Sequence, residues 1–359
     1  MSIAIRLMRQ LLRTPTPPSS DKTTLDEALS DLRWMLLKLH PHDSTMKNRF
    51  HLNSGSASLR AENKQKLKMV SDSVLLLSER QRRVLESWVS LRAEKQKPLQ
   101  YILGTLPFAG LDLIVRPPTL IPRWETEEWA MRVVDTIKSH MTRHPPSMNE
   151  PIHILDLCTG SGCIALALAN HIPAAHILAI DNAPSAIKLA RLNARRNALS
   201  HRVSVAQLDF MRGSIAEAVS AIESVFKVSY PAPLHGPSTK FFHYIVSNPP
   251  YVPQCEYEQL DRSVLDWEDK AALVGTDADA LGFYRRISLL SEKLLSSNSP
   301  AAKNVLFKEQ ERVFLEIGGT DQVDGVQRAL LDAEFISVQV WKDLAANDRV
   351  IVGLKKGTD

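Results

Sequence analysis

The spacing of apolar residues divides the chain into two parts of different character. In the first part apolar side chains recur every three or four positions, as on one face of a helix. This period predicts helices over residues 24–39, 61–77 and 78–98. Thr24 with Glu27, and Ser78 with Gln81, have the spacing of capping boxes. Together the three elements predict a small helical domain, which we assign to residues 21–97 and to substrate recognition.

Short β-like runs broken by Gly and Pro follow in residues 98–120, and they predict a hairpin linker rather than a core. After the linker, apolar strands alternate with helices. Strands are predicted over 152–157, 176–180, 203–207, 244–247, 313–317, 335–341 and 350–354, and helices over 164–170 and 184–197. We expect the last two strands to form an antiparallel pair. This alternation is typical of an α/β domain with a mostly parallel, doubly wound sheet, here assigned to residues 121–359.

Charge is unevenly distributed along the chain. Residues 1–100 carry 18 Lys and Arg against 10 Asp and Glu, a net charge of +8, which leaves −4 for the remaining 259 residues. An excess of positive charge suits a polyanionic partner such as RNA, which would place the protein near the ribosome. Solvated helix faces are the simpler interpretation of the same pattern.

The first 20 residues combine apolar side chains with Arg6, Arg9 and Arg13, and no acidic residue precedes Asp21. This composition is typical of a mitochondrial transit peptide, so we expect the mitochondrial matrix, with a frayed terminus in a cytoplasmic protein as the alternative. No run of about 20 apolar residues occurs, which predicts no membrane insertion.

The three cysteines, Cys158, Cys163 and Cys255, form no CxxC pair. They indicate a reducing compartment, and we expect no metal site.

A glycine turn joins the strand ILDL to the following helix, in the order Asp156, Gly160 and Gly162. Glycines at such a turn let the backbone approach a ligand closely. Asp181 ends the next strand, 19 residues beyond Gly162, where an acid can accept both hydroxyls of a ribose. The pattern therefore predicts a nucleotide-type cofactor site.

The cofactor follows from the spacing of this turn. A dinucleotide-binding Rossmann domain would carry G-x-G-x-x-G, but Ala165 stands at the third glycine position. The form D-x-x-x-G-x-G fits an S-adenosylmethionine site better, with Asp156 either holding the turn or approaching the methionyl end. After the third strand, Asp209 is placed for the amino group of adenine and Phe210 for its face.

The stretch IVSNPPY ends the fourth predicted strand, at the edge of the sheet where open α/β folds bind ligands. Asn248 offers an amide oxygen, and Pro249 and Pro250 stiffen the loop and leave carbonyl acceptors. Tyr251 supplies a flat ring. We expect Asn248 and the Pro249 carbonyl to accept the two N–H groups of a planar amine or amide and to direct its nitrogen at the cofactor. Adenine bases and glutamine side chains both satisfy this description.

Several motifs, in their order and spacing along residues 20–355, resemble those of the HemK/PrmC-type release factor glutamine N5-methyltransferases. They are PLQYILG, LIPRWETE, DLCTGSGCIALALA, AIDNAPSAIKLARLNA, IVSNPPY, ALVGTDADALGFYRRI, LEIGGTDQ and DLAANDRV. The resemblance implies a Rossmann-like class I S-adenosylmethionine-dependent methyltransferase domain, joined by a hinge-like hairpin to a helical domain. It also implies that the substrate is the glutamine of a Gly-Gly-Gln loop in a peptide chain release factor.

The resemblance also implies roles for particular residues. The glutamine would be held by Asn248, Pro249, Pro250 and Tyr251, and catalysis is assigned to Asn248, Pro249 and Tyr251. S-adenosylmethionine would be contacted by Cys158, Thr159, Gly160, Ser161, Gly162, Asp181, Phe210 and Asn248.

The loop LIPRxETE of these methyltransferases borders the cofactor pocket, and here it contains Arg123 and Glu125. Its alternative role is that of an ordinary loop that opens the helix from Trp124. Cys158 stands where bacterial members typically have Gly, and we expect a negative φ there. Phe210 stands where Trp can occur.

Two other functions fit parts of the pattern. An adenine-N6 methyltransferase acting on RNA or DNA would use the same amide-gripping loop, and a cofactor-binding protein without activity would keep the same fold. We expect a monomer. Residues 228–241 are interpreted as an inserted surface loop of no assigned role.

Overall fold

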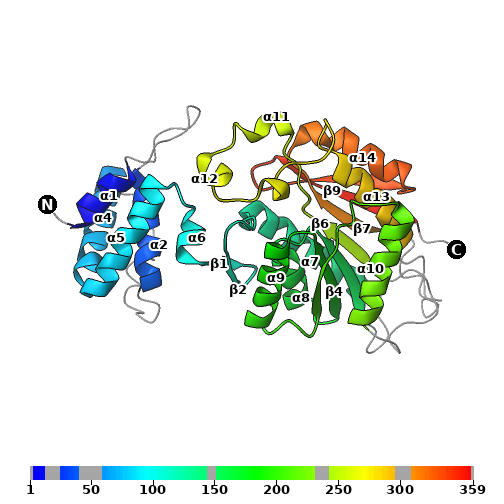
Figure 1. The fold of residues 1–359 in the computed structure, drawn as a ribbon, viewed down its shortest axis with the longest axis horizontal. Coiled ribbons are helices and arrows are strands. Elements are labelled where there is room, and N and C mark those ends of the chain that lie inside the picture. The colour runs from blue at the N-terminus through cyan, green and yellow to red at the C-terminus, as the bar shows by residue number, and fades with distance from the viewer. Residues whose placement is uncertain are drawn as a thin grey trace. The chain divides into compact units, whose positions relative to one another are not determined.

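The computed structural model describes residues 3–12, 25–39, 59–143, 151–230, 242–295 and 309–356. These residues form two compact units (Figure 1). The first comprises the chain up to Thr105 together with Leu260–Trp267, and the second comprises Leu106–Gln259 and the chain from Glu268 onward. Thr24, most of the predicted loop over 41–60 and most of the 228–241 insertion lie outside the described residues.

Helices build the first unit, because their apolar stripes face one another. They are α1 (Ile3–Leu11), α2 (Leu25–Leu39), α4 (Leu59–Leu75), α5 (Glu79–Glu94) and α6 (Leu99–Leu103). The short α12 (Arg262–Leu265) is grouped with this unit but buries no side chain. Leu32 and Leu36 of α2 pack with Leu85 and Val89 of α5, and all four are fully buried. The capping box of Ser78 with Gln81 is present at the start of α5, which confirms that prediction.

Helix α1 lies in the segment that the sequence predicts to be a transit peptide. Its side chains Leu7, Met8 and Leu11 are buried in the core of the helical unit. Arg6 also forms an ion pair with Glu86 of α5. Removal of this segment would therefore expose apolar surface that α1 covers.

The predicted linker differs from expectation in two ways. It begins with a short helix, α6, which Gly104 ends in a left-handed conformation with φ +76°. The hairpin itself is confirmed as β1 (Thr105–Phe108) and β2 (Leu111–Ile114). The prediction that it lies outside a core is wrong, because Phe108 and Leu113 are buried in the core of the second unit. Its short runs carry no periodic signal that distinguishes packed from exposed strands.

The second unit contains a seven-stranded sheet in the order β5-β4-β3-β6-β7-β9-β8. The strands are β3 (Ile152–Leu157), β4 (Ala175–Asp181), β5 (Val203–Gln207), β6 (Tyr244–Ser247), β7 (Glu309–Glu316), β8 (Ser337–Lys342) and β9 (Asp348–Lys356). β5, β4, β3, β6 and β7 run parallel, and β9 pairs antiparallel with both β7 and β8. This arrangement confirms the α/β fold and the antiparallel end of the sheet.

Two groups of helices cover the two faces of this sheet (Figure 1). One core contains side chains of α7 (Trp124–Arg143), α8 (Cys163–His171) and α9 (Pro184–Arg196). The other contains those of α10 (Ile215–Ser229), α13 (Gly282–Leu294) and α14 (Val323–Asp332), three helices that were not predicted from the sequence.

The strand order fixes where a ligand can bind. From β3 the chain moves outward through β4 and β5, and then returns to β6 on the other side of β3. The loops after β3 and β6 therefore diverge, and open α/β sheets bind their ligands at such a switch point.

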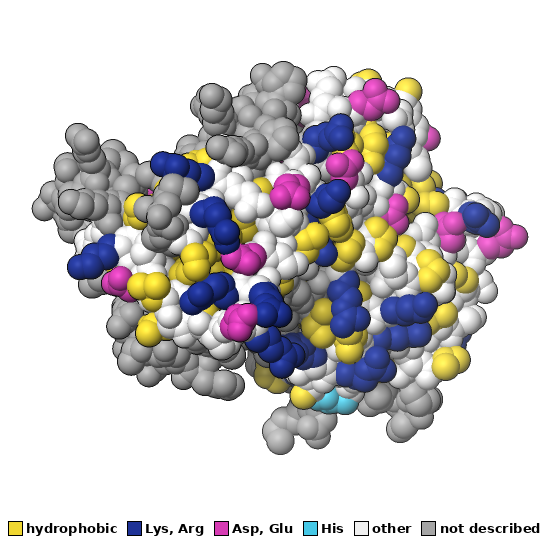
Figure 2. Space-filling view, turned by 60° about the vertical axis from the view of Figure 1, so that its left-hand side comes forward, with side chains coloured by type: hydrophobic (Ala, Val, Ile, Leu, Met, Phe, Trp, Pro, Cys, Tyr) yellow, Lys and Arg dark blue, Asp and Glu magenta, His cyan; other side chains and the backbone are white. Residues whose placement is uncertain are grey.

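Positive charge is not confined to the helical unit. Lys188, Arg191, Arg195 and Arg196 are exposed on α9, and no acidic residue occurs between Asp181 and Asp209. Figure 2 shows Lys and Arg side chains gathered on the face that it draws.

None of the helices in the described ranges has the length and apolar composition that a bilayer crossing requires. In the same ranges, no three His, Cys, Asp or Glu side chains are placed to hold a metal ion.

Candidate active site

The turn after β3 and the end of β4 are joined by one carboxylate. Asp181 Oδ2 accepts the backbone N–H of Gly160 at 2.8 Å, and its Oδ1 accepts that of Ala183 at 2.9 Å. Gly162 has a φ of +84° and is the N-cap of α8. A Cβ at Gly162 would lie 3.2 Å from the Cβ of Ala190, so a close helix approach adds to the conformational need for glycine here.

The carboxylate of Asp156 stabilises this turn by a hydrogen bond within it. Its Oδ2 accepts the Thr159 hydroxyl at 2.6 Å, and its side chain is fully buried. Burial raises the pKa of Asp156 to about 7, although the bond from Thr159 opposes this. The Ser161 carbonyl accepts Asn193 Nδ2 at 3.0 Å, which ties the turn to α9. The side chains of Asp156 and Thr159 and the backbone of Ser161 therefore shape the turn, and none of these three residues lines the pocket described below.

Cys158 adopts a φ of +61°, so the expectation of a negative φ at this position is wrong. The turn requires a left-handed residue here, a conformation that costs an L side chain of order 1–3 kcal/mol. Burial, with the carboxylates of Asp181 and Asp156, raises the pKa of the Cys158 thiol. Cys158 is therefore a neutral thiol at physiological pH, and its side chain lines the pocket.

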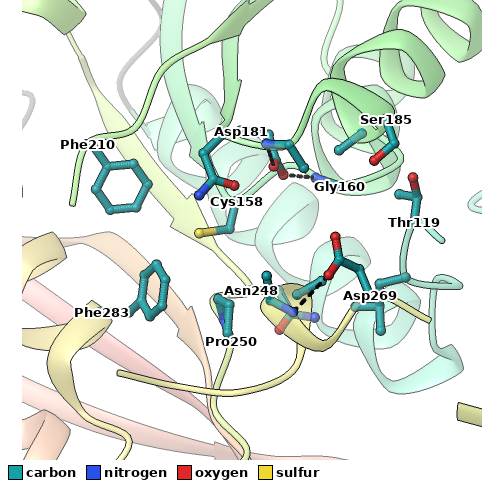
Figure 3. Close-up of a pocket in the computed structure, with 16 residues that line it drawn as sticks. Thr119, Cys158, Gly160, Asp181, Ser185, Phe210, Asn248, Pro250, Asp269 and Phe283 are labelled. Atoms are coloured by element: carbon teal, nitrogen blue, oxygen red, sulfur yellow. Dashed lines mark hydrogen bonds between the residues drawn. The ribbon is translucent and has the colours of Figure 1, made fainter. Parts of the chain in front are cut away.

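A pocket that is partly open to solvent lies beside these two turns. Figure 3 shows Cys158, Asp181 and Gly160 along one side, with Asn248 and Pro250 across from them.

Two aromatic rings close one end of the pocket. Phe210 and Phe283 meet edge to face, with ring centroids 6.3 Å apart (Figure 3). Phe283 comes from α13, within the motif ALVGTDADALGFYRRI, and its role was not predicted from the sequence. Both rings line the pocket and offer apolar surface that a flat heterocycle can contact.

The opposite wall comes from two loops that an ion pair joins. Arg123 Nη2 donates to both carboxylate oxygens of Glu268, at 2.7 and 2.8 Å. The Asp269 N–H donates to the Pro118 carbonyl at 2.7 Å. Arg123 therefore fixes the wall without lining the pocket, whereas Asp269 lines it. Glu125 is half-buried at the start of α7 and does not line the pocket either.

Asp209 does not lie where the sequence pattern predicts it. Its Oδ1 accepts the Met211 N–H at 3.1 Å, and its Oδ2 pairs with Arg212 Nε at 2.9 Å. The carboxylate thus caps its own turn, and Asp209 is not among the pocket-lining residues. Phe210, Phe283 and Asp181, by contrast, all line the pocket.

The IVSNPPY loop meets the pocket at its other end. Asn248 and Pro250 line the pocket, and Pro249 is buried beside them. The Tyr251 carbonyl accepts Gln322 Nε2 at 2.9 Å, and Gln322 Oε1 accepts the Gly318 N–H at 2.8 Å.

The ring of Tyr251 packs on the backbone of the β7 turn. A Cβ at Gly318 would lie 3.0 Å from Tyr251 Cδ2, so a side chain at this position would crowd the ring. Burial, followed by the charge of Glu316, raises the pKa of the Tyr251 hydroxyl, which therefore remains protonated. Gln322 and Gly318 both belong to the motif LEIGGTDQ, yet only the structure shows that they hold Tyr251.

These groups fit S-adenosylmethionine. The Asp181 carboxylate faces the pocket from the end of β4, as ribose hydroxyls require. The rings of Phe210 and Phe283 suit adenine. The glycine turn leaves open space for a ligand, because a Cβ added to Gly160 would meet no heavy atom within 4 Å beyond its chain neighbours.

Comparison with known proteins identifies the class first. Residues 154–234 match the family described as "Methyltransferase domain". Three curated relatives then indicate which family of methyltransferases the chain resembles. A release factor glutamine methyltransferase of Flavobacterium psychrophilum is 32% identical, over 73% of this chain and 77% of its own. The mitochondrial MRF1 N(5)-glutamine methyltransferase MTQ1 of Saccharomyces cerevisiae is 32% identical, over 75% of this chain and 74% of its own. The probable mitochondrial counterpart of Schizosaccharomyces pombe is 33% identical, over 74% and 77%.

The chain belongs to the release factor glutamine methyltransferase family. It is therefore an enzyme, and S-adenosylmethionine is its methyl donor. Among solved structures, the catalytic domain of METTL16 in complex with a MAT2A hairpin aligns with a TM-score of 0.45 and 13% identity, over 79% of this chain and 83% of its own. That similarity is too low to indicate function.

Proposed function

We propose that this enzyme methylates the side-chain nitrogen of glutamine in the Gly-Gly-Gln loop of a peptide chain release factor. The observation that carries the proposal is the position of Asn248. Its side chain lines the cofactor pocket and belongs to the same stiff loop as Pro249, Pro250 and Tyr251. A planar amide held by this loop would meet the cofactor at its reactive end.

The chemistry required is to orient a poor nucleophile. An amide nitrogen is weakly nucleophilic because its lone pair is delocalised into the carbonyl. Asn248 Oδ1 and the Pro249 carbonyl would each accept one of its N–H groups, contributing about 1 kcal/mol net each. Fixing the nitrogen in line with the methyl group is worth more, up to roughly 7–11 kcal/mol. Catalysis by Asn248 and Pro249 is therefore mainly a matter of position.

Bound S-adenosylmethionine supplies an electrophilic methyl group on a positively charged sulfur. The chain's own groups hold the remainder of that molecule away from the reacting nitrogen. Asp181 takes the ribose hydroxyls, and Phe210 and Phe283 offer apolar ring surface to the adenine. The turn from Cys158 to Gly162 presents backbone atoms to the methionyl end. Tyr251 stiffens the substrate loop through its packing on Gly318.

The proposed location is the mitochondrial matrix. The relatives of both yeasts carry "mitochondrial" in their names, and the first 20 residues are rich in Arg and free of acids. The substrate would then be an organellar release factor. Fluorescent fusions of the full chain, and of the chain lacking residues 1–20, test this location. Residence of the full chain in the cytoplasm would contradict it.

The helical domain over residues 21–97 is proposed to recognise the release factor, and its positive charge to place the enzyme close to the ribosome. The hairpin over 98–120 would join it to the methyltransferase domain over 121–359. We propose that the enzyme acts as a monomer.

Methyl transfer from labelled S-adenosylmethionine to a purified organellar release factor tests the proposal. We expect label in the wild-type factor and none in a variant whose Gly-Gly-Gln glutamine is replaced by glutamate. Label in RNA or DNA with none in protein would favour the adenine-N6 alternative. Cofactor binding with no transfer to any release factor would favour a non-enzymatic role.

A further inference from the structure

A buried chain of hydrogen bonds leads from the end of β7 to Asn248. Glu316, only 1% exposed, accepts two hydrogen bonds on the same carboxylate oxygen, Oε2. The donors are the Thr126 hydroxyl at 2.8 Å and Trp129 Nε1 at 2.6 Å, both on α7. The Thr126 oxygen lies in turn 3.4 Å from Asn248 Nδ2. These hydrogen bonds thus join β7, α7 and the loop after β6, which are distant in the sequence.

The direction of each bond follows from which atoms carry protons. An indole N–H can only donate, so Glu316 Oε2 must be an acceptor. The Thr126 hydroxyl has a single proton, and it is already directed at Glu316. Its remaining lone pairs can only accept, and they face the side-chain amide of Asn248.

An asparagine amide can be turned either way, and the surrounding hydrogen bonds decide between the two orientations. With the oxygen of Asn248 toward Thr126, two oxygens would face each other with no proton between them. With the NH2 group toward Thr126, as the structure has it, the amide oxygen is turned away from α7. That oxygen is the acceptor that the proposed glutamine requires.

We propose that Thr126 and Glu316 are positioning residues that fix the Asn248 amide with its oxygen toward the substrate nitrogen. The inference rests on the proposed function of Asn248. It adds that catalysis depends on a hydroxyl and a carboxylate that touch neither substrate nor cofactor. Neither Thr126 nor Glu316 lines the pocket.

The burial of this network shields its hydrogen bonds from solvent. Thr126 is 2% exposed and Trp129 3% exposed, so water does not compete for their bonds. Burial raises the pKa of Glu316 to about 7, while the bonds from Trp129 and Thr126 lower it. The two donors therefore stabilise the ionised form of Glu316 against the cost of its burial.

Thr126→Val tests the proposal, because valine keeps the shape of threonine and removes the hydroxyl. We expect kcat for release factor methylation to fall about 10- to 100-fold, since small misplacements of reacting groups have effects of that order. The KM for the release factor and the Kd for S-adenosylmethionine should change less than about threefold. Thr126→Ser should restore kcat to within about threefold of wild type, because the hydroxyl returns.

Two further variants keep the test decisive. Thr136→Val is the matched control, since Thr136 lies on the same helix and its hydroxyl donates only to the Arg132 carbonyl of that helix. It should leave kcat unchanged. If Thr126→Val does not fold, Thr126→Ala replaces it, with the same kcat loss expected.

A wild-type kcat in Thr126→Val would overturn the positioning role. So would a loss of S-adenosylmethionine binding that parallels the loss of kcat in Thr126→Val and Thr126→Ala. Failure of the wild-type enzyme to methylate any release factor would instead overturn the proposed function. The two failures are therefore distinguishable.

Discussion

The carboxylate of Asp181 accepts the backbone N–H of Gly160 at 2.8 Å, so the end of β4 holds the glycine turn that follows β3. The two strands are paired in parallel, with Leu157 opposite Ile180, and their carboxyl ends therefore lie level. Burial raises the pKa of Asp181, while bonds from Ala183 and Gly160 lower it. One side chain thus shapes the turn and also faces the cofactor pocket.

Asp181→Asn should weaken cofactor binding. The amide has one acceptor oxygen in place of two and carries no charge, so it cannot hold both backbone N–H groups and a ribose. We expect the Kd for S-adenosylmethionine to rise about 10- to 100-fold, the range for lost hydrogen bonds to a charged group. Calorimetric titration measures this. Asp135→Asn, an exposed carboxylate on α7, is the control and should bind as wild type. An unchanged Kd in Asp181→Asn would remove Asp181 from the site.

Phe283→Ala tests the second ring of the pocket. An aromatic contact of this kind contributes about 0.5–1.5 kcal/mol beyond buried area, so the Kd for S-adenosylmethionine should rise about three- to tenfold. Phe283→Tyr keeps the ring and should bind within about twofold of wild type. Equal affinities for the Ala and Tyr variants would show that the ring of Phe283 does not contact the cofactor.

The positive φ of Cys158 predicts a strict limit on what can replace it. Cys158→Val should lower the free energy of unfolding by about 2 kcal/mol or more, because a β-branched residue at φ +61° is strongly disfavoured. Cys163→Val is the matched control, since Cys163 lies in α8. It should cost less than Cys158→Val. Urea unfolding compares the two, and equal losses would mean that backbone strain is not the cause.

The buried environment of His243 leads us to expect that the free energy of unfolding falls in mild acid. Its Nδ1 accepts the His153 N–H at 3.0 Å, which only an unprotonated Nδ1 can do. Burial, and then the charge of Arg312, lowers the pKa of His243 to about 3 from its ordinary value of 6.5. Below about pH 6.5 the unfolded chain binds a proton that the folded chain does not. Stability is therefore lost as pH falls from there toward about pH 3, by up to about 1.4 kcal/mol per pH unit.

His243→Asn isolates this effect, since the amide oxygen can take the place of Nδ1 and does not titrate. Between about pH 6.5 and about pH 5 the wild type should lose about 2 kcal/mol more stability than the variant. Urea unfolding at each pH measures the difference, with the exposed His201→Asn as control. Identical pH dependence in wild type and His243→Asn would show that His243 does not contribute.

Local patterns were sufficient to predict the strands and the turns that carry the site. The buried parallel strands read as apolar runs, and β3, β4, β5 and β6 begin and end within one residue of their predicted limits. Asp181 and Asn248 could be assigned because each ends such a run, and parallel strands bring their ends to one edge. Phe210 was assigned on the same basis, and it lines the pocket.

Features that depend on tertiary contacts could not be predicted in this way. Asp209 follows a strand just as Asp181 does, but its carboxylate is used by Met211 and Arg212 nearby. Phe283 reaches the pocket from a helix that no predicted strand end identifies. The sign of φ at Cys158 is set by the path of the turn, which the identity of the residue does not reveal.

The amide of Asn248 is the centre of the proposed mechanism, and Asn248→Ala tests it most directly. The measurement is the mass of the release factor peptide containing Gly-Gly-Gln after incubation with S-adenosylmethionine and either enzyme. We predict that the wild-type enzyme adds one methyl group to its glutamine. The rate with Asn248→Ala should fall at least about 100-fold, the order expected when a positioned hydrogen-bonding group is lost. Full methylation by Asn248→Ala at the wild-type rate would contradict the account.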